Sequence, residues 1–171
     1  MILGLDISTS ITGATVIDDK GEIVLCEAWD TRKYKNFFDK AAHIRSCLVD
    51  VKNEFPIKTI VVEQSLQMFR AGFSSAKTLT TLSKFNGAVS WMCYNIMEVE
   101  PEYVSATSAR KQIGIKVPRG TKAKEVVLEH IKNNILNFEY ELTKAGNPKA
   151  GTYDRADSIV LAKYAHLTPQ R

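Results

Sequence analysis

The sequence predicts an α/β fold with a central mixed five-stranded sheet, in which three antiparallel strands are followed by parallel additions, flanked by helices. Two patterns lead to this prediction. Three short β-prone runs follow one another at the start of the chain with turn residues between them, which is typical of antiparallel hairpins. Further strand-like runs then alternate with amphipathic segments, and strands joined through helices usually run parallel. The length of 171 residues suits one domain, which we expect to span residues 1–171.

The first strand is an apolar run, Met1 to Leu5, that leads directly into the carboxylate of Asp6. A polar turn follows, and the β-prone run Ile11–Ile17 then turns back. Glu22–Trp29 alternates loosely and forms the third strand. Because apolar residues flank Asp6, we expect it in a buried segment at the centre of the sheet. A buried charge is costly unless it is paired or binds a cation, so Asp6 needs partners.

Periodicity predicts the other elements. The β-branched run Thr59–Glu63 predicts a fourth strand, which also ends in a carboxylate, and Glu102–Ser105 predicts a short fifth strand. Apolar residues at spacings of three and four predict helices over 36–54, 74–97, 107–113, 122–136 and 153–167. We expect the 74–97 helix to be mostly buried, because it is apolar on more than one face. Thr152 is the expected cap of the last helix.

Composition narrows the class of protein. The net charge is a modest +4, and no apolar stretch approaches the ~18 residues that span a bilayer. The start of the chain lacks the basic and apolar regions of a signal peptide, because Asp6 interrupts it. Cys26, Cys47 and Cys93 are widely spaced and form no CxxC pair. We therefore expect a cytoplasmic protein with no membrane partner, no disulfide framework and no zinc site.

Four carboxylates occupy unusual positions. Asp6 and Glu63 end two strands, whereas Asp154 and Asp157 lie three residues apart at the start of the last helix, a spacing that puts them on one face. If the first and fourth strands are neighbours, all four converge. Oxygen ligands without His or Cys favour Mg²⁺ or Mn²⁺. Two such ions ~4 Å apart can activate a water and stabilise the leaving oxygen of a phosphodiester.

Each of these carboxylates also has a structural interpretation. Asp154 can simply complement the positive end of the helix dipole, which is worth ~0.5 kcal/mol. Asp157 can be a solvated position, and Glu63 can mark the exposed end of its strand. Asp6 is the hardest of the four to explain without a partner. Spacing alone therefore leaves both a metal centre and a set of unrelated acidic residues as interpretations.

The stretch 111–124 is a candidate DNA-binding surface, because it carries five basic residues and no acidic one. These residues are Lys111, Lys116, Arg119, Lys122 and Lys124. Lys122 and Lys124 open a helix, where a cation opposes the helix dipole and gains nothing for the helix itself. Phosphate binding explains their presence, and it should weaken steeply with salt. An ordinary solvated surface is the alternative.

The loop 65–73, directly after Glu63, carries Phe69 and Arg70. Both are candidate DNA contacts, because an apolar side chain there could stack on bases opened at a strand crossover. Packing of the loop against the core or a second subunit is the alternative. The 74–97 helix offers a face for a twofold homodimer, with complete burial in the core as its alternative.

Several segments resemble the RuvC-type Holliday junction resolvases of the ribonuclease H-like superfamily, over nearly the whole chain. ILGLDISTSITGATVI is similar to the opening strand pair of that family, roughly ILGIDPG followed by TGYGVI. VVEQ resembles its second acidic strand, GTKAKEVV its segment with a DNA-binding lysine, and YDRADSIVLAKYAH its closing helix, with the pattern DAADALAIA. Ile7 and Ser8 stand where the family has Pro-Gly in the first turn.

The resemblance implies a ribonuclease H-like fold in which Asp6, Glu63, Asp154 and Asp157 are the catalytic, metal-binding carboxylates. It implies an endonuclease that uses two Mg²⁺ ions, with Mn²⁺ able to substitute. Members of the family act as homodimers that nick opposing strands of a four-way DNA junction. The short chain and its departures from the pattern indicate a divergent member of viral or phage type, acting in the host cytoplasm.

Two other functions are compatible with parts of the sequence. A non-catalytic branched-DNA-binding protein would keep the same fold. Actin-like ATPases also begin with a strand, an Asp, a turn and a strand, and use the turn to hold phosphate. They need two lobes, for which 171 residues are too few, and they lack a closing helix with paired carboxylates.

Overall fold

The computed structural model of the protein describes residues 1–64, 76–136 and 138–168. Over these residues the elements follow one another in the predicted order. The strands are β1 (Ile2–Asp6), β2 (Ile11–Ile17), β3 (Ile23–Asp30), β4 (Thr59–Glu63) and β5 (Glu102–Val104). The helices are α1 (Phe37–Glu54), α2 (Ala76–Met97), α3 (Ala106–Gln112), α4 (Ala123–Asn134) and α5 (Thr152–Leu167).

One mixed sheet holds the strands in the order β3-β2-β1-β4-β5. β1, β2 and β3 pair antiparallel, whereas β4 runs parallel to β1, and β5 runs parallel to β4. β1 is therefore the central strand and is paired on both sides, which confirms the predicted fold class. The carboxyl ends of β1, β4 and β5 lie at one end of the sheet, because parallel strands share their direction.

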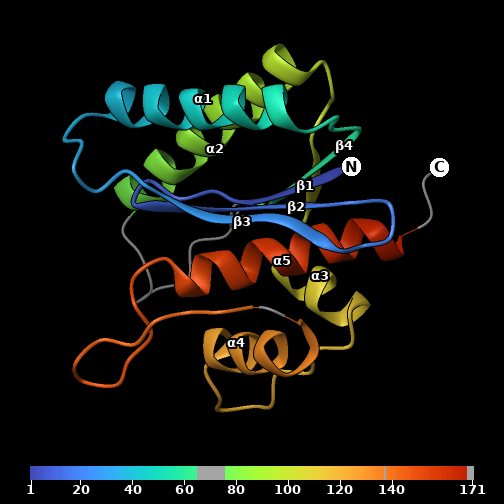
Figure 1. The fold of residues 1–171 in the computed structure, drawn as a ribbon. Helices are drawn as coiled ribbons and strands as arrows, with labels where there is room; N and C mark the ends of the chain where they lie inside the picture. Colours follow the sequence, from blue (N-terminus) through green and yellow to red (C-terminus); the bar gives the residue numbers. More distant parts are fainter. Residues whose placement is uncertain (65–75, 137, 169–171) are drawn as a thin grey trace.

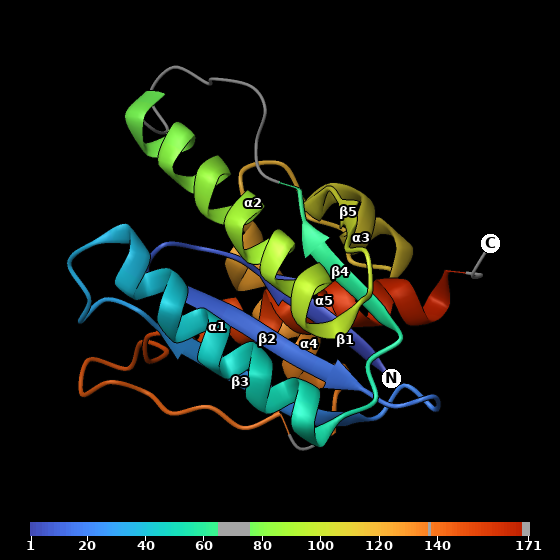
Figure 2. The same ribbon diagram turned by 90° about the horizontal axis from the view of Figure 1, so that it is seen from above.

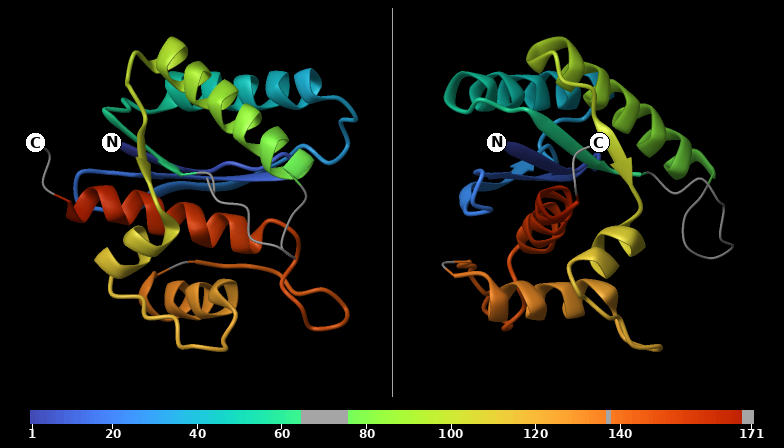
Figure 3. Two further views of the ribbon diagram at one scale, coloured as in Figure 1. Left: turned by 180° about the vertical axis from the view of Figure 1, so that it is seen from behind. Right: turned by 90° about the vertical axis from the view of Figure 1, so that its right-hand side faces the viewer.

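Helices cover both faces of the sheet (Figure 1). α1 and α2 lie over one face, as the view from above shows (Figure 2). α5 lies across the other face with α3 beside it, and α4 packs on the far side of α5 (Figure 3). In the part of the chain that the structure describes, no helix combines the length and apolar character needed to cross a membrane.

The alternation of side chains along β1 divides the core in two. Leu3 and Leu5 are fully buried in the cluster between the sheet and α1 and α2, which includes Phe85. Ile2 packs on the opposite side, against the cluster that contains residues of α5. Successive side chains of a strand point to opposite faces, so Asp6 points to the same side as Ile2. Asp6 therefore faces α5.

Two glycines let the main chain of α5 lie directly on the sheet. A Cβ atom added at Gly4 would lie 2.5 Å from the carbonyl oxygen of Ser158, and one added at Gly13 would lie 1.9 Å from that of Asp154. Both distances are far shorter than a van der Waals contact, so no larger residue fits at either position. The contact fixes α5 closely above β1 and β2 and brings its first turn to the end of β1.

The start of α5 differs from the sequence prediction. Gly151 is the N-cap, in the left-handed conformation (φ 89°), and no side chain caps the helix. Thr152 is the first helical residue and is buried, so its predicted role as the cap is wrong. The reason lies in packing and backbone conformation. A Cβ atom at Gly151 would lie 2.6 Å from Cβ of Ala28, and the left-handed backbone favours glycine.

Only one face of α2 is buried over the described residues, so the prediction of a mostly buried helix is wrong. The buried face carries Phe85, Val89 and Cys93, spaced by four residues. Trp91 and Tyr94 lie outside this face and are 63% and 56% exposed. Large apolar and aromatic residues therefore occur both on the buried face of α2 and on its exposed face. The number of such residues in the helix does not show which of them are buried.

Candidate active site

The parallel pairing of β1 with β4 places two carboxylates side by side. The register pairs Leu5 with Val62, so that Asp6 follows beside Glu63 where the two strands end. Val61 packs in the cluster on the α5 side of the sheet, and Glu63, two residues further on, points to the same side. Asp6 and Glu63 therefore both face α5.

The first two turns of α5 supply the other two carboxylates. Asp6 pairs with Gly13 across β1 and β2, and the main-chain carbonyl of Asp154 rests on that same glycine. Asp157 lies about one turn further along the helix and is buried. The ends of β1 and β4 and the start of α5, which are far apart in the sequence, thus lie together. We call this set of four carboxylates, Asp6, Glu63, Asp154 and Asp157, the acidic corner.

The four carboxylates influence one another's protonation. Burial raises the pKa of Asp6 well above its ordinary value, and the charges of Glu63, Asp157 and Asp154 raise it further. Burial also raises the pKa of each of the other three groups. The charge of Asp157 adds to the raised pKa of Glu63, and the charge of Asp154 adds to that of Asp157. Such a site either retains protons or binds cations.

Two positive side chains face the acidic corner. Lys124, in the first turn of α4, lowers the pKa of all four carboxyl groups. Arg110 of α3 lowers the pKa of Glu63 and Asp157, and its Nη2 atom lies 3.8 Å from Oδ1 of Asp157. Among the described residues, the four carboxylates outnumber the cations that act on them, and the site has an excess of negative charge when all of these groups are ionised.

The donor set fits hard divalent metal ions. Carboxylate oxygens are the ligands that Mg²⁺ and Mn²⁺ prefer, and the corner contains neither His nor Cys. Within residues 1–64, 76–136 and 138–168, no three acidic, histidine or cysteine side chains lie close enough together to form a ready-made metal site. A bound divalent cation would offset the repulsion among the four side chains, which burial strengthens.

A cavity of about 200 Å³ lies beside the acidic corner. Asp6, Glu63, Asp154 and Lys124 line it together with Asn86 of α2. This volume accommodates several water molecules at about 30 Å³ each. Asn86 is buried and donates a hydrogen bond from Nδ2 to the main-chain oxygen of Glu63 at 3.1 Å. That bond ties α2 to the end of β4 and so fixes the main chain that carries the Glu63 carboxylate.

The turn after Asp6 is held by side chains. The Thr12 hydroxyl accepts a hydrogen bond from the Ser8 amide at 3.3 Å and donates one to the Ser8 carbonyl at 3.2 Å. The carbonyl of Thr9 accepts hydrogen bonds from Oγ1 of Thr31 at 2.9 Å and from Nζ of Lys40 at 2.5 Å. Thr31, directly after β3, and Lys40 of α1 therefore support the turn at the point where the sequence departs from the Pro-Gly pattern.

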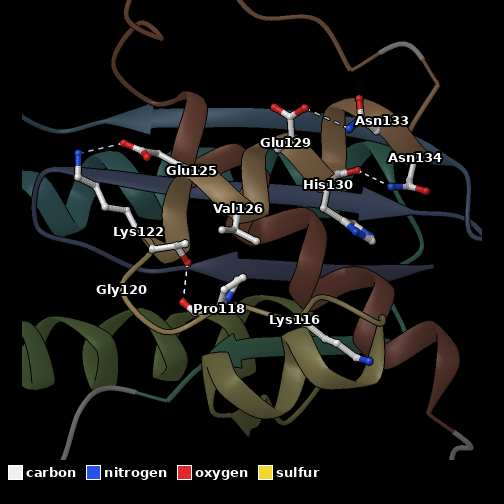
Figure 4. A pocket seen from close by; sticks show the side chains of 11 residues that line it. Lys116, Pro118, Gly120, Lys122, Glu125, Val126, Glu129, His130, Asn133 and Asn134 are labelled. Carbon is white, nitrogen blue, oxygen red and sulfur yellow. Dashed lines mark hydrogen bonds and ion pairs between the residues drawn. The ribbon is translucent and has the colours of Figure 1, made fainter.

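The structure describes four of the six predicted DNA-binding residues, Lys111, Arg119, Lys122 and Lys124. Lys124 lines the cavity beside the carboxylates, whereas Lys122 is the N-cap of α4 and pairs with Glu125 at 3.0 Å. Figure 4 shows this pair at one end of an open groove of about 730 Å³ along α4. Phe69 and Arg70 lie outside the described residues.

Arg110 is the residue of α3 that reaches the acidic corner, although the sequence singled out its neighbour. Lys111 is exposed, and so is Arg119 in the segment between α3 and α4. The helical spacing in the sequence indicates that Arg110 points inward. Arg110 lies three residues before Ile113, which packs against the core, and residues three apart share a face of a helix.

Solved structures share this fold, although no protein-family model and no curated protein matches the sequence. T. thermophilus RuvC in complex with a Holliday junction substrate superposes with a TM-score of 0.69 and 16% identity, over 97% of this chain and 92% of that chain. The chain has the fold of RuvC. Thermus thermophilus RuvC in a second structure gives a TM-score of 0.63 and 17% identity, over 97% and 93% of the two chains.

A eukaryotic protein extends the comparison. The yeast mitochondrial Holliday junction resolvase superposes with a TM-score of 0.56 and 14% identity, over 97% of this chain and 79% of that chain. All three similarities span 97% of this chain. They confirm the ribonuclease H-like architecture that the sequence motifs imply.

Proposed function

We propose that residues 1–171 form one nuclease domain that cuts Holliday junctions and other branched DNA with the help of divalent metal ions. The acidic corner carries this proposal, because four carboxylates from β1, β4 and α5 share a buried site beside a cavity that Lys124 also lines. The fold supports the choice of substrate. RuvC, which has the same fold, is known in complex with a Holliday junction substrate.

In this proposal the four carboxylates of the acidic corner hold two Mg²⁺ ions, for which Mn²⁺ can substitute. Bound ions of this kind supply an activated water and stabilise the leaving 3′ oxygen, so that the products carry 5′-phosphate and 3′-hydroxyl ends. Lys124 binds a phosphate of the cut strand at the mouth of the cavity. Arg110 orients Asp157 through their ion pair. The hydrogen bond from Asn86 holds the Glu63 main chain in position.

The rest of the DNA would contact basic residues around the site. Lys111 is exposed on α3, and Arg119 and Lys122 are exposed in the segment between α3 and α4. These three residues extend the phosphate contacts away from Lys124. The loop that carries Phe69 and Arg70 follows the Glu63 strand directly, which supports contacts of these two side chains with the crossover.

A homodimer fits this substrate, because a four-way junction offers two symmetry-related strands to cut. The outer face of α2, where Trp91 and Tyr94 are exposed, supplies an uncovered aromatic surface for the second subunit. Sedimentation at micromolar concentration tests this part of the proposal. A mass near that of one chain, 19.1 kDa, would contradict it.

Incubation with three synthetic substrates tests the function. A four-way junction, a Y-shaped DNA and a linear duplex are each treated with the protein in Mg²⁺ and in EDTA. We expect cuts in the branched DNA, little cutting of the linear duplex, and no cutting in EDTA. Mapping the new ends then checks the 5′-phosphate and 3′-hydroxyl chemistry. Intact junctions in both Mg²⁺ and Mn²⁺ would contradict the nuclease function.

A non-catalytic protein that binds branched DNA is the second candidate. It is favoured by one observation, that no three acidic side chains among the described residues form a ready-made metal site. The same three substrates distinguish the two functions. Selective binding of the junction without cutting in either metal supports the binding protein, whereas metal-dependent cutting supports the nuclease.

A further inference from the structure

A second group of positive side chains lies at the same end of the sheet as the acidic corner. The loop between β3 and α1, residues 31–36, carries three exposed cations, Arg32, Lys33 and Lys35. β3 ends at Asp30, which pairs with Ile11 at the start of β2, and β2 begins where the turn after Asp6 ends. The loop therefore lies at the carboxyl end of β1, and it projects beyond the sheet in Figure 2.

Hydrogen bonds fix this loop to the turn after Asp6. The Thr31 amide donates to the carbonyl of Ser10 at 2.9 Å, and the Thr31 hydroxyl lies within hydrogen-bonding distance of the carbonyls of Thr9 and Ser10. Thr31 is fully buried. Within the loop, the Tyr34 amide donates to the Thr31 carbonyl at 3.0 Å. The loop thus presents its cations from a fixed position, and preorganisation lowers the entropic cost of binding.

The three cations are not equivalent. Nε and Nη2 of Arg32 donate to the two carboxylate oxygens of Asp30 at 2.9 and 2.6 Å, and this contact lowers the pKa of Asp30 to about 2. Arg32 also lowers the pKa of Asp154, so the loop is within electrostatic reach of the acidic corner. Among the described residues, Lys33 and Lys35 have no acidic partner at salt-bridge distance. Their charges remain available to a phosphate.

The acidic corner lies between two groups of cations. β3 and β5 are the opposite edge strands of the sheet, and the chain runs from β5 into α3 and α4. Arg110 lies on α3, the helix that follows β5, and acts on Glu63 and Asp157. The loop 31–36 follows β3, and its Arg32 acts on Asp154. In a four-way junction each strand leaves one duplex arm and enters the next at the crossover, so duplex DNA lies on both sides of a strand that is cut there.

We infer that the loop 31–36 binds the sugar-phosphate backbone of a second duplex arm, on the side of the cut strand opposite to Arg110. This inference rests on the proposed function and adds the means by which the site distinguishes branched from linear DNA. A linear duplex is straight and engages one group of cations, whereas the arms of a junction diverge at the crossover and engage both groups. The loop then contributes to selectivity without touching the reacting phosphate.

Binding of a fluorescent four-way junction in EDTA, measured over a range of salt concentrations, tests the inference. The double variant K33Q/K35Q should bind the junction about tenfold more weakly at about 0.1 M salt. The slope of log K against log salt should fall by about 2 for each bound subunit, because each phosphate contact contributes about 0.9 to it. Affinity for a linear duplex should change less than twofold.

The matched control is K52Q/K58Q, which removes the same charge from the opposite end of the sheet. Lys52 lies in the last turn of α1, and Lys58 precedes the strand residue that pairs with Ile2. Thermal melting verifies that both variants are folded. A hydroxyl-radical footprint of the junction should lose protection on one arm for each bound subunit with K33Q/K35Q and keep it with K52Q/K58Q.

The outcomes separate this inference from the proposed function. Equal weakening by the two double variants, or an equal loss on linear duplex, shows that only net charge matters and overturns the inference. In that case the unmodified protein still cuts the junction in Mg²⁺. If the unmodified protein neither prefers nor cuts the junction, the proposed function fails, and the inference fails with it.

Discussion

The Nη2 atom of Arg110 lies 3.8 Å from Oδ1 of Asp157, and the two side chains are only 19% and 10% exposed. α3 and α5 thus hold an ion pair inside the acidic corner. Arg110 lowers the pKa of Asp157, whereas burial raises it. The separation exceeds the ~2.8 Å of a tight charge-assisted hydrogen bond. Arg110 therefore acts on Asp157 chiefly through its positive charge. A bound cation would compensate the charge of Asp157 in the same way.

Replacing Arg110 tests this charge compensation. Arg110→Gln should destabilise the protein in EDTA by about 1–3 kcal/mol, because it leaves a buried carboxylate with less compensation. Thermal unfolding would show a lower Tm. Mn²⁺ should raise the Tm of the variant more than that of the unmodified protein, since the ion supplies the missing charge. Lys111→Gln, at the exposed neighbour, should stay within about 0.5 kcal/mol, and equal melting of the two variants would contradict the prediction.

Asp6→Asn should stabilise the protein in EDTA at neutral pH. The pKa of Asp6 in the folded state is raised above 3.8, so the folded state binds more protons than the unfolded state. The stability associated with this protonation is complete below the unfolded pKa and is lost as the pH rises through the raised pKa. Asn carries no charge and avoids the loss, with an expected gain of about 1–3 kcal/mol. Urea unfolding between about pH 4 and about pH 8 should show the advantage growing with pH.

The same substitution should remove activity but not binding. In Mg²⁺ the cutting rate of Asp6→Asn should fall by about 1,000-fold, while its affinity for the junction stays within about threefold, because the DNA contacts lie on other residues. Asp19→Asn, at a side chain that is 92% exposed, is the control for an acid-to-amide change. Loss of folding and binding together with activity would show that Asp6 is structural.

Gly13→Ala should displace the start of α5. The added Cβ would lie 1.9 Å from the Asp154 carbonyl, so the helix must move or the strand must bend, at a cost of about 1–3 kcal/mol. Cutting should fall as well, because Asp154 moves with the helix. Gly87→Ala is the control, since a Cβ atom there meets nothing within 4 Å. In the interior of α2 this change should stabilise the protein by about 0.5–1 kcal/mol, and opposite shifts in Tm are the expected result.

Asn86→Ala should weaken metal binding through the Glu63 main chain. The substitution leaves the Glu63 carbonyl without its side-chain donor and should cost about 1–3 kcal/mol of stability. The affinity for Mn²⁺, titrated calorimetrically, should fall because Glu63 is held less firmly. Ser90→Ala removes only a 3.4 Å contact to Asn86 and serves as the control. Unchanged Mn²⁺ affinity in Asn86→Ala, despite a lower Tm, would limit Asn86 to a role in stability.

The sequence contains much of the framework of the acidic corner. Two local patterns are visible in the sequence and present in the structure. One is the pair of apolar strands that end in Asp6 and Glu63, and the other is the helical spacing of Asp154 and Asp157. The pairing of β1 with β4 makes these local patterns converge. The roles of the four residues stay predictions until activity is measured.

Other features depend on contacts between distant segments and are not visible in local patterns. Gly4 and Gly13 are needed only because α5 lies directly on them, although glycine inside a strand is a known sign of close backbone approach. Arg110 was overlooked beside Lys111 because net charge along a stretch does not reveal which side chain points inward. Gly151 replaces Thr152 as the cap because the packing against Ala28 leaves no room for a side chain.

The contact of α5 with Gly4 and Gly13 also determines when the acidic corner can form during synthesis of the chain. β1 and β4 emerge from the ribosome early and can pair, but Asp154 and Asp157 are added on the order of ten seconds later at ordinary rates of translation. Until then the nascent chain has an incomplete acidic corner and one uncovered face of its sheet. Folding of the last helix therefore completes the acidic corner and covers the second face of the sheet in the same step.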